Sequence, residues 1–153
     1  MIKEAIHSVN APKAIGPYSP AVRIGDFIFL SGQIPIDPAT GKIEAEDIKG
    51  QTRQVLNNMK AILAECGIDM NYILKTNVYL TDMNEFAAMN EVYAEYFEAP
   101  YPARCAAEVS KLAMGAKVEI EAYALDTRAL EVLCCDTAAC TNCSESNDCV
   151  NAE

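Results

Sequence analysis

The hydrophobic residues of this chain change their spacing several times along the sequence, and this alternation limits the possible folds more than any other feature. Runs rich in β-branched and aromatic residues predict strands, whereas apolar residues at three- and four-residue steps predict helices. The predicted strands cover residues 21–24, 27–30, 73–81, 103–110 and 117–125, and the predicted helices cover residues 45–66 and 82–97. This order predicts an α+β domain in which a mixed β-sheet carries both helices packed on one face.

Turn and capping residues set the expected ends of these elements. Gly25 and Asp26 predict a tight turn, which makes the first two strands a candidate hairpin. Gly67 is expected to end the first helix. Asp82 is expected to cap the second helix, with Glu85 three residues later completing a reciprocal capping box.

The second face of the predicted sheet has no helix to cover it, so we expect a homo-oligomer in which another copy covers that face. A length of 153 residues is typical of one domain. The formal net charge of −10 disfavours nucleic acid as a partner. No apolar run approaches the roughly 18 residues of a membrane span, and the N-terminus lacks the apolar core of a secretory signal. We therefore expect a cytoplasmic protein with no membrane partner.

The last 25 residues differ in composition from the rest of the chain. They contain no Lys or Arg, five acidic residues and five of the seven cysteines, namely Cys134, Cys135, Cys140, Cys143 and Cys149. We expect a domain over residues 1–127 and an acidic, cysteine-rich tail over residues 128–153. Zinc, an iron–sulfur cluster or a redox disulfide would suit cysteines at this spacing. The alternative, which the polar and acidic composition favours, is a disordered thiol-rich appendage with no metal.

The inventory of reactive residues narrows the possible chemistry. His7 is the single histidine, which argues against Ser–His and Cys–His triads and against His-rich metal sites. No glycine-rich phosphate loop is present, so no nucleotide cofactor is expected. Arg104 stands among small residues in "APYPARCAAEV", where its planar guanidinium could bind a ligand carboxylate. The alternative for Arg104 is a structural ion pair, with the candidate partners Glu108, Glu119 and Glu121.

Five segments of the chain stand out together, namely "AIGPYSPAV", "LSGQIPIDPATG", "MNEVYAEYF", "YPARCAAEV" and "VEIEAYAL". In this order and at this spacing, they resemble the YjgF/RidA family of 2-iminobutanoate/2-iminopropanoate deaminases. The resemblance covers about residues 1–127. It implies a homotrimer of chorismate-mutase-like α+β subunits, small-molecule clefts between neighbouring chains, and the hydrolysis of 2-imino acids to 2-oxo acids and ammonia without a cofactor.

The resemblance also implies a role for individual residues. Arg104 would hold the carboxylate of the imino acid, and Glu119 would orient the attacking water. The remaining substrate-binding candidates are Tyr18, Ser31, Gly32, Asn90 and Cys105. The chain departs from the family at one of these positions, because many members carry cysteine two positions after the arginine. Here Cys105 follows the arginine directly and Ala106 takes the second position.

Two alternatives to an imine deaminase remain at this stage. The first is a non-catalytic trimeric module that uses the same arginine to bind or sense 2-oxo or imino acids. The second is an RNA-directed role, which has been attached to this family and which the acidic net charge disfavours. Each site candidate also has a structural alternative: an interface aromatic for Tyr18, a polar strand or helix residue for Ser31, Asn90 and Glu119, and a backbone bend for Gly32.

Overall fold

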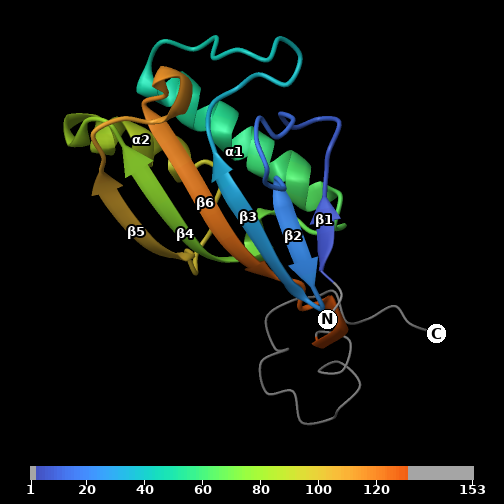
Figure 1. The fold of residues 1–153 in the computed structure, drawn as a ribbon. Coiled ribbons are helices and arrows are strands. Elements are labelled where there is room, and N and C mark those ends of the chain that lie inside the picture. Colours follow the sequence, from blue (N-terminus) through green and yellow to red (C-terminus); the bar gives the residue numbers. More distant parts are fainter. Residues whose placement is uncertain (1–2, 131–153) are drawn as a thin grey trace.

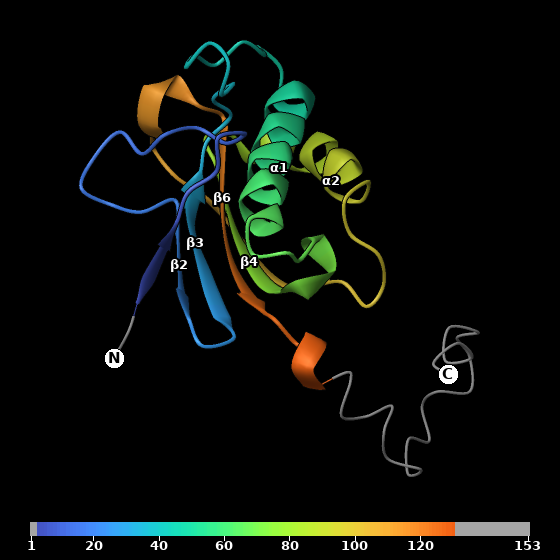
Figure 2. The ribbon, with the colours of Figure 1, turned by 90° about the vertical axis from the view of Figure 1, so that its right-hand side faces the viewer.

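The computed structural model describes residues 3–130, which form one six-stranded sheet with helices on one face (Figures 1 and 2). The strand order across the sheet is β1-β2-β3-β6-β4-β5. The strands are β1 (Glu4–Ile6), β2 (Ala21–Ile24), β3 (Phe27–Gln33), β4 (Ile73–Leu80), β5 (Ala103–Glu108) and β6 (Val118–Leu125). Only the pair β4–β5 is parallel, so the sheet is mixed as predicted.

The helices α1 (Ile48–Ala64) and α2 (Phe86–Tyr93) lie side by side against the same face of the sheet (Figure 2). Strand β6 shows why the helices pack on this face, because its residues alternate between buried and more exposed positions. Val118 and Ile120 are fully buried against the helices, together with Val55 and Met59 of α1. The hydrophobic core therefore fills the space between the sheet and the two helices.

The starts of both helices differ from the sequence prediction. Helix α1 begins at Ile48 because the side chain of Asp47 accepts a hydrogen bond from the backbone N–H of Gly50. Asp82 caps a short 3₁₀ turn, Met83–Glu85, before α2 begins. Glu85 accepts a hydrogen bond from Lys117 in place of the expected bond within a capping box. Helix α2 is also shorter than the helix predicted over residues 82–97, because it ends at Tyr93.

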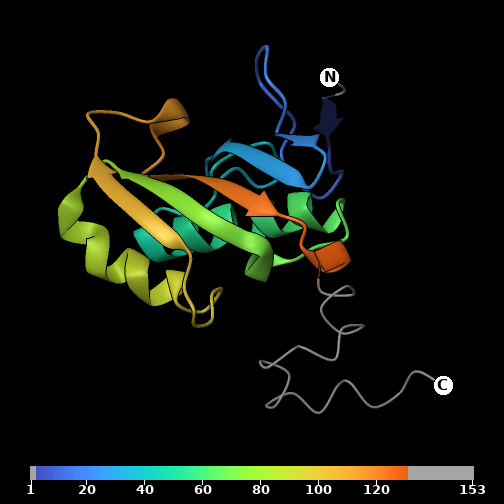
Figure 3. The same ribbon diagram turned by 90° about the horizontal axis from the view of Figure 1, so that it is seen from below.

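The other face of the sheet carries aromatic side chains that no helix of residues 3–130 covers. Phe27 and Phe29 stack with ring centroids 6.5 Å apart, and Phe29 meets Tyr123 edge to face at 5.7 Å. All three are exposed in the single chain. Residues 7–20 lie near one side of this face (Figures 2 and 3). We call this surface the open face, and it matches the uncovered face that the sequence predicts.

Asp126 and Arg128 together connect the end of β6 to the turn that follows α1. The Asp126 carboxylate accepts hydrogen bonds from Arg23 and Arg128, and Arg128 also donates to the backbone carbonyls of Cys66 and Gly67. Arg128 lies one residue beyond the expected domain boundary at residue 127, yet it contacts the fold directly. None of the helices within residues 3–130 is long and apolar enough to cross a membrane.

Candidate functional site

Arg104 lies on the edge strand β5, on the face of the sheet that carries the helices. Its register partner on β4 is Thr76, which is fully buried beneath α2. The Nη1 atom of Arg104 donates a hydrogen bond of 2.7 Å to the Oδ1 atom of Asn90. The guanidinium carbon lies 4.8 Å from the ring centroid of Tyr93 and 5.4 Å from that of Phe86. Cation–π attraction and one hydrogen bond thus hold the guanidinium beside α2.

Three residues of α2 hold Arg104 because they share one face of the helix. Phe86, Asn90 and Tyr93 are spaced by four and three residues, which is the spacing of neighbours on a helix surface. Sequence reasoning gave Phe86 and Tyr93 no contact with Arg104. Their helical spacing with Asn90 is the signal that could have revealed it.

No carboxylate pairs with Arg104 within residues 3–130. The five ion pairs found there do not include it. Glu108 accepts a hydrogen bond from the backbone N–H of Met83, and Glu119 and Glu121 lie on the opposite face of the sheet. The structural ion pair with one of these three glutamates, which was the alternative interpretation of Arg104, is therefore absent from the described chain.

Arg104 lines a surface hollow of about 370 Å³ between α2, the loop that follows it and the edge of β5. This volume lies within the range of small-molecule sites. The residues that line it are Asn90, Tyr93, Ala94, Tyr101, Pro102 and Arg104. In this hollow, Arg104, the predicted carboxylate anchor, therefore lies beside uncharged side chains.

Glu119 lies on β6 and points to the open face. An extra residue on β3 disrupts its pairing with β6 between Leu30 and Gln33, and Gly32 lies within this bulge. A Cβ atom built on Gly32 would stand only 2.0 Å from the Oε1 atom of Glu119. The carboxylate of Glu119 thus packs over the bare backbone of Gly32.

Burial raises the pKa of Glu119 above its ordinary value of 4.5, and the negative charge of Glu121 raises it further. Glu121 is the next outward residue on β6. Its Oε1 atom accepts hydrogen bonds from the Nδ2 atom of Asn77 at 2.6 Å and from the hydroxyl of Tyr79 at 3.4 Å. Sequence reasoning gave Asn77, Tyr79 and Glu121 no part in this cluster, because it depends on the register of β4 against β6.

Ser31 connects the loop that carries Tyr18 to the same region. The Ser31 hydroxyl donates a hydrogen bond of 2.7 Å to the carbonyl of Ser19, and the Ser31 N–H donates to the carbonyl of Pro20. Tyr18 is 48% exposed. The open-face group therefore contains Ser31, Gly32 and Glu119, with the Tyr18 loop bonded to it.

The two predicted catalytic residues lie on opposite faces of one sheet. Arg104 is in register with Thr76 and, across β4, with Ala122, both of which face the helices. Glu119 is in register with Tyr79 on the open face. A small ligand cannot touch both side chains of one chain, because the hydrogen-bonded backbone of the sheet lies between them.

Cys105 points away from Arg104, since successive side chains of a strand face opposite sides. It is exposed and pairs in register with Asn77 of the open face. Ala106, the next residue, lies on the same face as Arg104 and is partly buried against the core. Cys105 is thus the one substrate-binding candidate that belongs to neither group described above.

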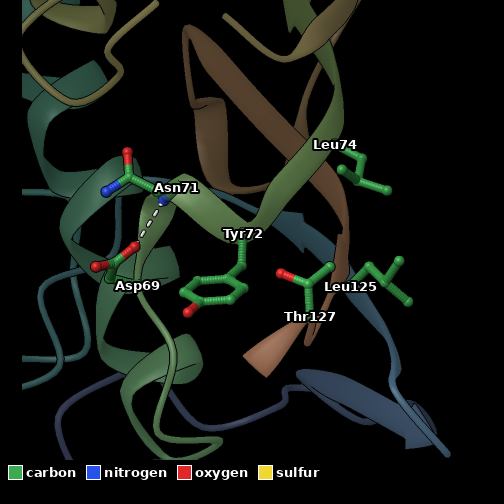
Figure 4. Close-up of a pocket in the computed structure, with 6 residues that line it drawn as sticks. All are labelled: Asp69, Asn71, Tyr72, Leu74, Leu125 and Thr127. Atoms are coloured by element: carbon green, nitrogen blue, oxygen red, sulfur yellow. Dashed lines mark hydrogen bonds between the residues drawn. The ribbon is translucent and has the colours of Figure 1, made fainter. Parts of the chain in front are cut away.

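A second hollow of about 300 Å³ lies where β4 begins and β6 ends (Figure 4). It contains none of the predicted site residues, and its lining consists of Asp69, Asn71, Tyr72, Leu74, Leu125 and Thr127. The side chain of Asp69 is already used locally, because it accepts a hydrogen bond from the backbone N–H of Asn71. No cluster of three His, Cys, Asp or Glu residues suited to a metal ion occurs in the part of the chain described. The cysteines from Cys134 to Cys149 fall outside that part.

The strand order and the two helices on one face define an α+β domain of the chorismate-mutase-like class. The model of the family described as "Endoribonuclease L-PSP" matches residues 8–126. The chain is 59% identical over 123 residues to a RutC family protein of Pyrococcus horikoshii, covering 80% of this chain and 98% of that protein. It is 42% identical over 125 residues to a protein of Mus musculus named 2-iminobutanoate/2-iminopropanoate deaminase, covering 82% of this chain and 93% of that protein.

A solved structure agrees with these sequence relationships. The crystal structure of the yjgF gene product of E. coli superposes with a TM-score of 0.77 at 43% identity, covering 80% of this chain and 98% of that chain. This chain belongs to the YjgF/RidA family. The family and the α+β fold class predicted from the sequence are both confirmed.

Proposed function

We propose that this protein is a 2-imino acid deaminase, which hydrolyses enamine and imine intermediates such as 2-aminoacrylate and 2-aminocrotonate to 2-oxo acids and ammonia. The observation that carries the proposal is the state of Arg104, an arginine without a carboxylate partner in the described chain, fixed by Asn90 and two aromatic rings at the edge of a hollow. The name of the Mus musculus relative supports the same reaction.

The first task of the site is to hold the substrate by its carboxylate. One guanidinium nitrogen of Arg104 is bonded to Asn90, which leaves the other N–H groups to donate to a ligand. Charge-assisted hydrogen bonds from a fixed guanidinium give orientation as well as affinity. The imine carbon, which is bonded to the carboxylate carbon, is then held in a defined position beside the anchor.

The second task is to deliver water to that carbon. Glu119 in its ionised form accepts a proton from the water as the oxygen attacks the imine carbon, and it passes this proton to the nitrogen to give a carbinolamine. The hydroxyl proton of the carbinolamine then also moves to the nitrogen. The C–N bond breaks as the carbonyl forms, so one water is consumed and one ammonia is released for each 2-oxo acid. Holding the water and the electrophile together supplies proximity and orientation, and the sequence of steps uses no metal or organic cofactor.

The third element of the proposal is the assembly. Arg104 and Glu119 face opposite sides of the sheet, so a site that uses both takes Arg104 from one chain and Glu119 from a neighbouring chain. The aromatic open face offers the surface for such an association. We propose a homotrimer, in which Tyr18, Ser31 and Gly32 approach the substrate from the same chain as Glu119.

The test is ammonia release from freshly generated 2-aminoacrylate in a coupled dehydratase assay, with Arg104→Lys beside the native protein. Lysine keeps the charge but loses the planar fork, so we expect kcat/KM to fall at least about a hundredfold while the oligomer stays folded. Ligand binding by the native protein without any turnover would favour the non-catalytic binding module. Normal turnover by Arg104→Lys would show that the carboxylate is bound elsewhere.

A further inference from the structure

The hollow beside Arg104 is larger than the smallest substrates of the proposed reaction require. It measures about 370 Å³, whereas 2-iminopropanoate and 2-iminobutanoate carry only a methyl or an ethyl side chain. Sites of this volume hold ligands of drug size. The space extends from Arg104 along the C-terminal end of α2 to Tyr101 and Pro102 in the loop before β5.

The part of the hollow beyond Arg104 offers rings and methyl groups without charge. Tyr93, Ala94, Tyr101 and Pro102 line it, and Tyr101 is 61% exposed in the single chain. The hydroxyl of Tyr93 points into the core, where it shares a hydrogen bond of 2.8 Å with Thr76. The ring of Tyr93 is only 5% exposed, because it packs against Phe97 and under Arg104, so Tyr93 adds no free polar group to the hollow.

Glu91 of α2 and Glu95, which follows the end of α2, are bonded elsewhere. Glu91 bonds to Lys49 of α1, and Glu95 bonds through both carboxylate oxygens to Arg53. Among residues 3–130, Arg104 is itself the only charged residue in the lining. A charged substrate side chain would find no partner of opposite charge here once Arg104 holds the carboxylate, and burying it would be unfavourable.

We propose that this hollow is a side-chain subsite that selects 2-imino acids with large uncharged side chains, above all aromatic ones. The inference rests on the proposed function for the role of Arg104. With the carboxylate on Arg104, the side chain of the same ligand lies against Ala94, the exposed ring of Tyr101 and the ring of Pro102. Aromatic side chains gain most from such a surface, because they bury a large apolar area and pack against other rings.

The variant Ala94→Phe tests the subsite by filling it. Ala94 is exposed at the end of α2, so a larger side chain can be placed there without disturbing the core. The matched control is Ala87→Phe, the same change at an exposed position of α2 that does not line the hollow. Imines of phenylalanine and alanine are generated by an amino acid oxidase, and their hydrolysis is measured above the uncatalysed rate.

We expect the native protein to have a kcat/KM at least about tenfold higher for the phenylalanine imine than for the alanine imine. Ala94→Phe should lower the value for the phenylalanine imine by about tenfold or more and leave that for the alanine imine within about twofold, and Ala87→Phe should change neither. Equal losses for both imines, no loss for either, or a native preference for the alanine imine would overturn the subsite.

Binding of the product-shaped 2-oxo acids separates this inference from the reaction itself. Calorimetry compares phenylpyruvate with pyruvate on the native protein and on Ala94→Phe. Tighter binding of phenylpyruvate by about tenfold, lost in Ala94→Phe, supports the subsite even if the native protein hydrolyses no imine. Equal affinity for the two 2-oxo acids overturns the subsite even if the protein is a deaminase.

Discussion

At Gly32 the absence of a side chain leaves room for the carboxylate of Glu119. The Cβ of an alanine there would lie 2.0 Å from the Oε1 atom of Glu119, far closer than atoms approach without displacement. The contact is with the end of a flexible side chain, which moves more easily than backbone. Gly32→Ala should therefore displace the carboxylate and lower kcat/KM by about tenfold or more, with a loss of stability below about 1 kcal/mol.

A double-mutant cycle shows whether Gly32 acts through Glu119. Gly32→Ala should have little further effect on kcat/KM in a Glu119→Gln background, because the group that it displaces no longer accepts a proton. Additive losses would instead mean that Gly32 contacts the substrate by itself. Thermal unfolding of each variant checks that the differences in kcat/KM do not come from a loss of folded protein.

The acid side of the activity profile should report on Glu119. Its pKa is raised above 4.5 by burial and by Glu121, and the proposed base works only when ionised. Activity should therefore fall as the pH drops through this raised value, at a higher pH than for an ordinary glutamate. Rates of imine hydrolysis across the acid range, corrected for the uncatalysed reaction, give the measurement.

The variant Glu121→Gln tests whether the charge of Glu121 helps to set this pH dependence. Glutamine can keep a hydrogen bond from Asn77 and removes the negative charge that helps to raise the pKa of Glu119. The acid limb should then move to lower pH, while the rate on its plateau stays near that of the native protein. An unchanged acid limb would mean that the loss of activity at low pH comes from the titration of a group other than Glu119.

Strand β4 and helix α2 act together on Arg104 through the pair formed by Thr76 and Tyr93. Tyr93→Phe removes their buried hydrogen bond but keeps the ring beneath the guanidinium. It should lower the free energy of unfolding by about 1–2 kcal/mol and leave kcat/KM within about threefold. Tyr93→Leu also removes the ring, so kcat/KM should fall by about five- to tenfold through weaker positioning of Arg104. Equal activity of the two variants would contradict a role for the ring.

Hydrophobic spacing predicted most elements because most of them bury a regular face. The alternation in β6 and the apolar stripe of α1 are local patterns, and the structure confirms both. Strand β1, with three residues, is too short to carry such a pattern and was not predicted. The bulge at Gly32 and the early end of α2 depend on contacts with distant segments, which local spacing does not record.

Apart from Arg104, which its small neighbours already marked, the residues of the candidate site were named from a resemblance, and the resemblance did not give their arrangement. Arg104 and Cys105 are neighbours in sequence and lie on opposite faces, as the period of a strand requires. To predict that Arg104 and Glu119 lie on opposite faces, one must also know the register of β5 on β4 and of β4 on β6. Register is a property of the assembled sheet, so a single sequence leaves it open.

At the scale of the whole molecule, the proposed use of both Arg104 and Glu119 in one site requires that the site is shared between chains, because the two residues lie on opposite faces of the sheet. Neither Arg104→Ala nor Glu119→Gln should be active by itself in this arrangement. A mixed oligomer of the two variants, formed by refolding or coexpression at equal amounts, contains some interfaces where a native Arg104 meets a native Glu119. In a closed ring of identical interfaces about a quarter of the sites are complete, so about a quarter of the native activity should return.

The control distinguishes a shared site from one built within a single chain. Chains that carry both substitutions are mixed in equal amounts with native chains. A shared site again leaves about a quarter of the sites complete, whereas a site within one chain leaves about half of them complete. A site within one chain would also give no recovery when the two single variants are mixed. Recovery in the first mixture and a quarter of the activity in the second would together place Arg104 and Glu119 of each working site on different chains, as the two faces of the sheet require.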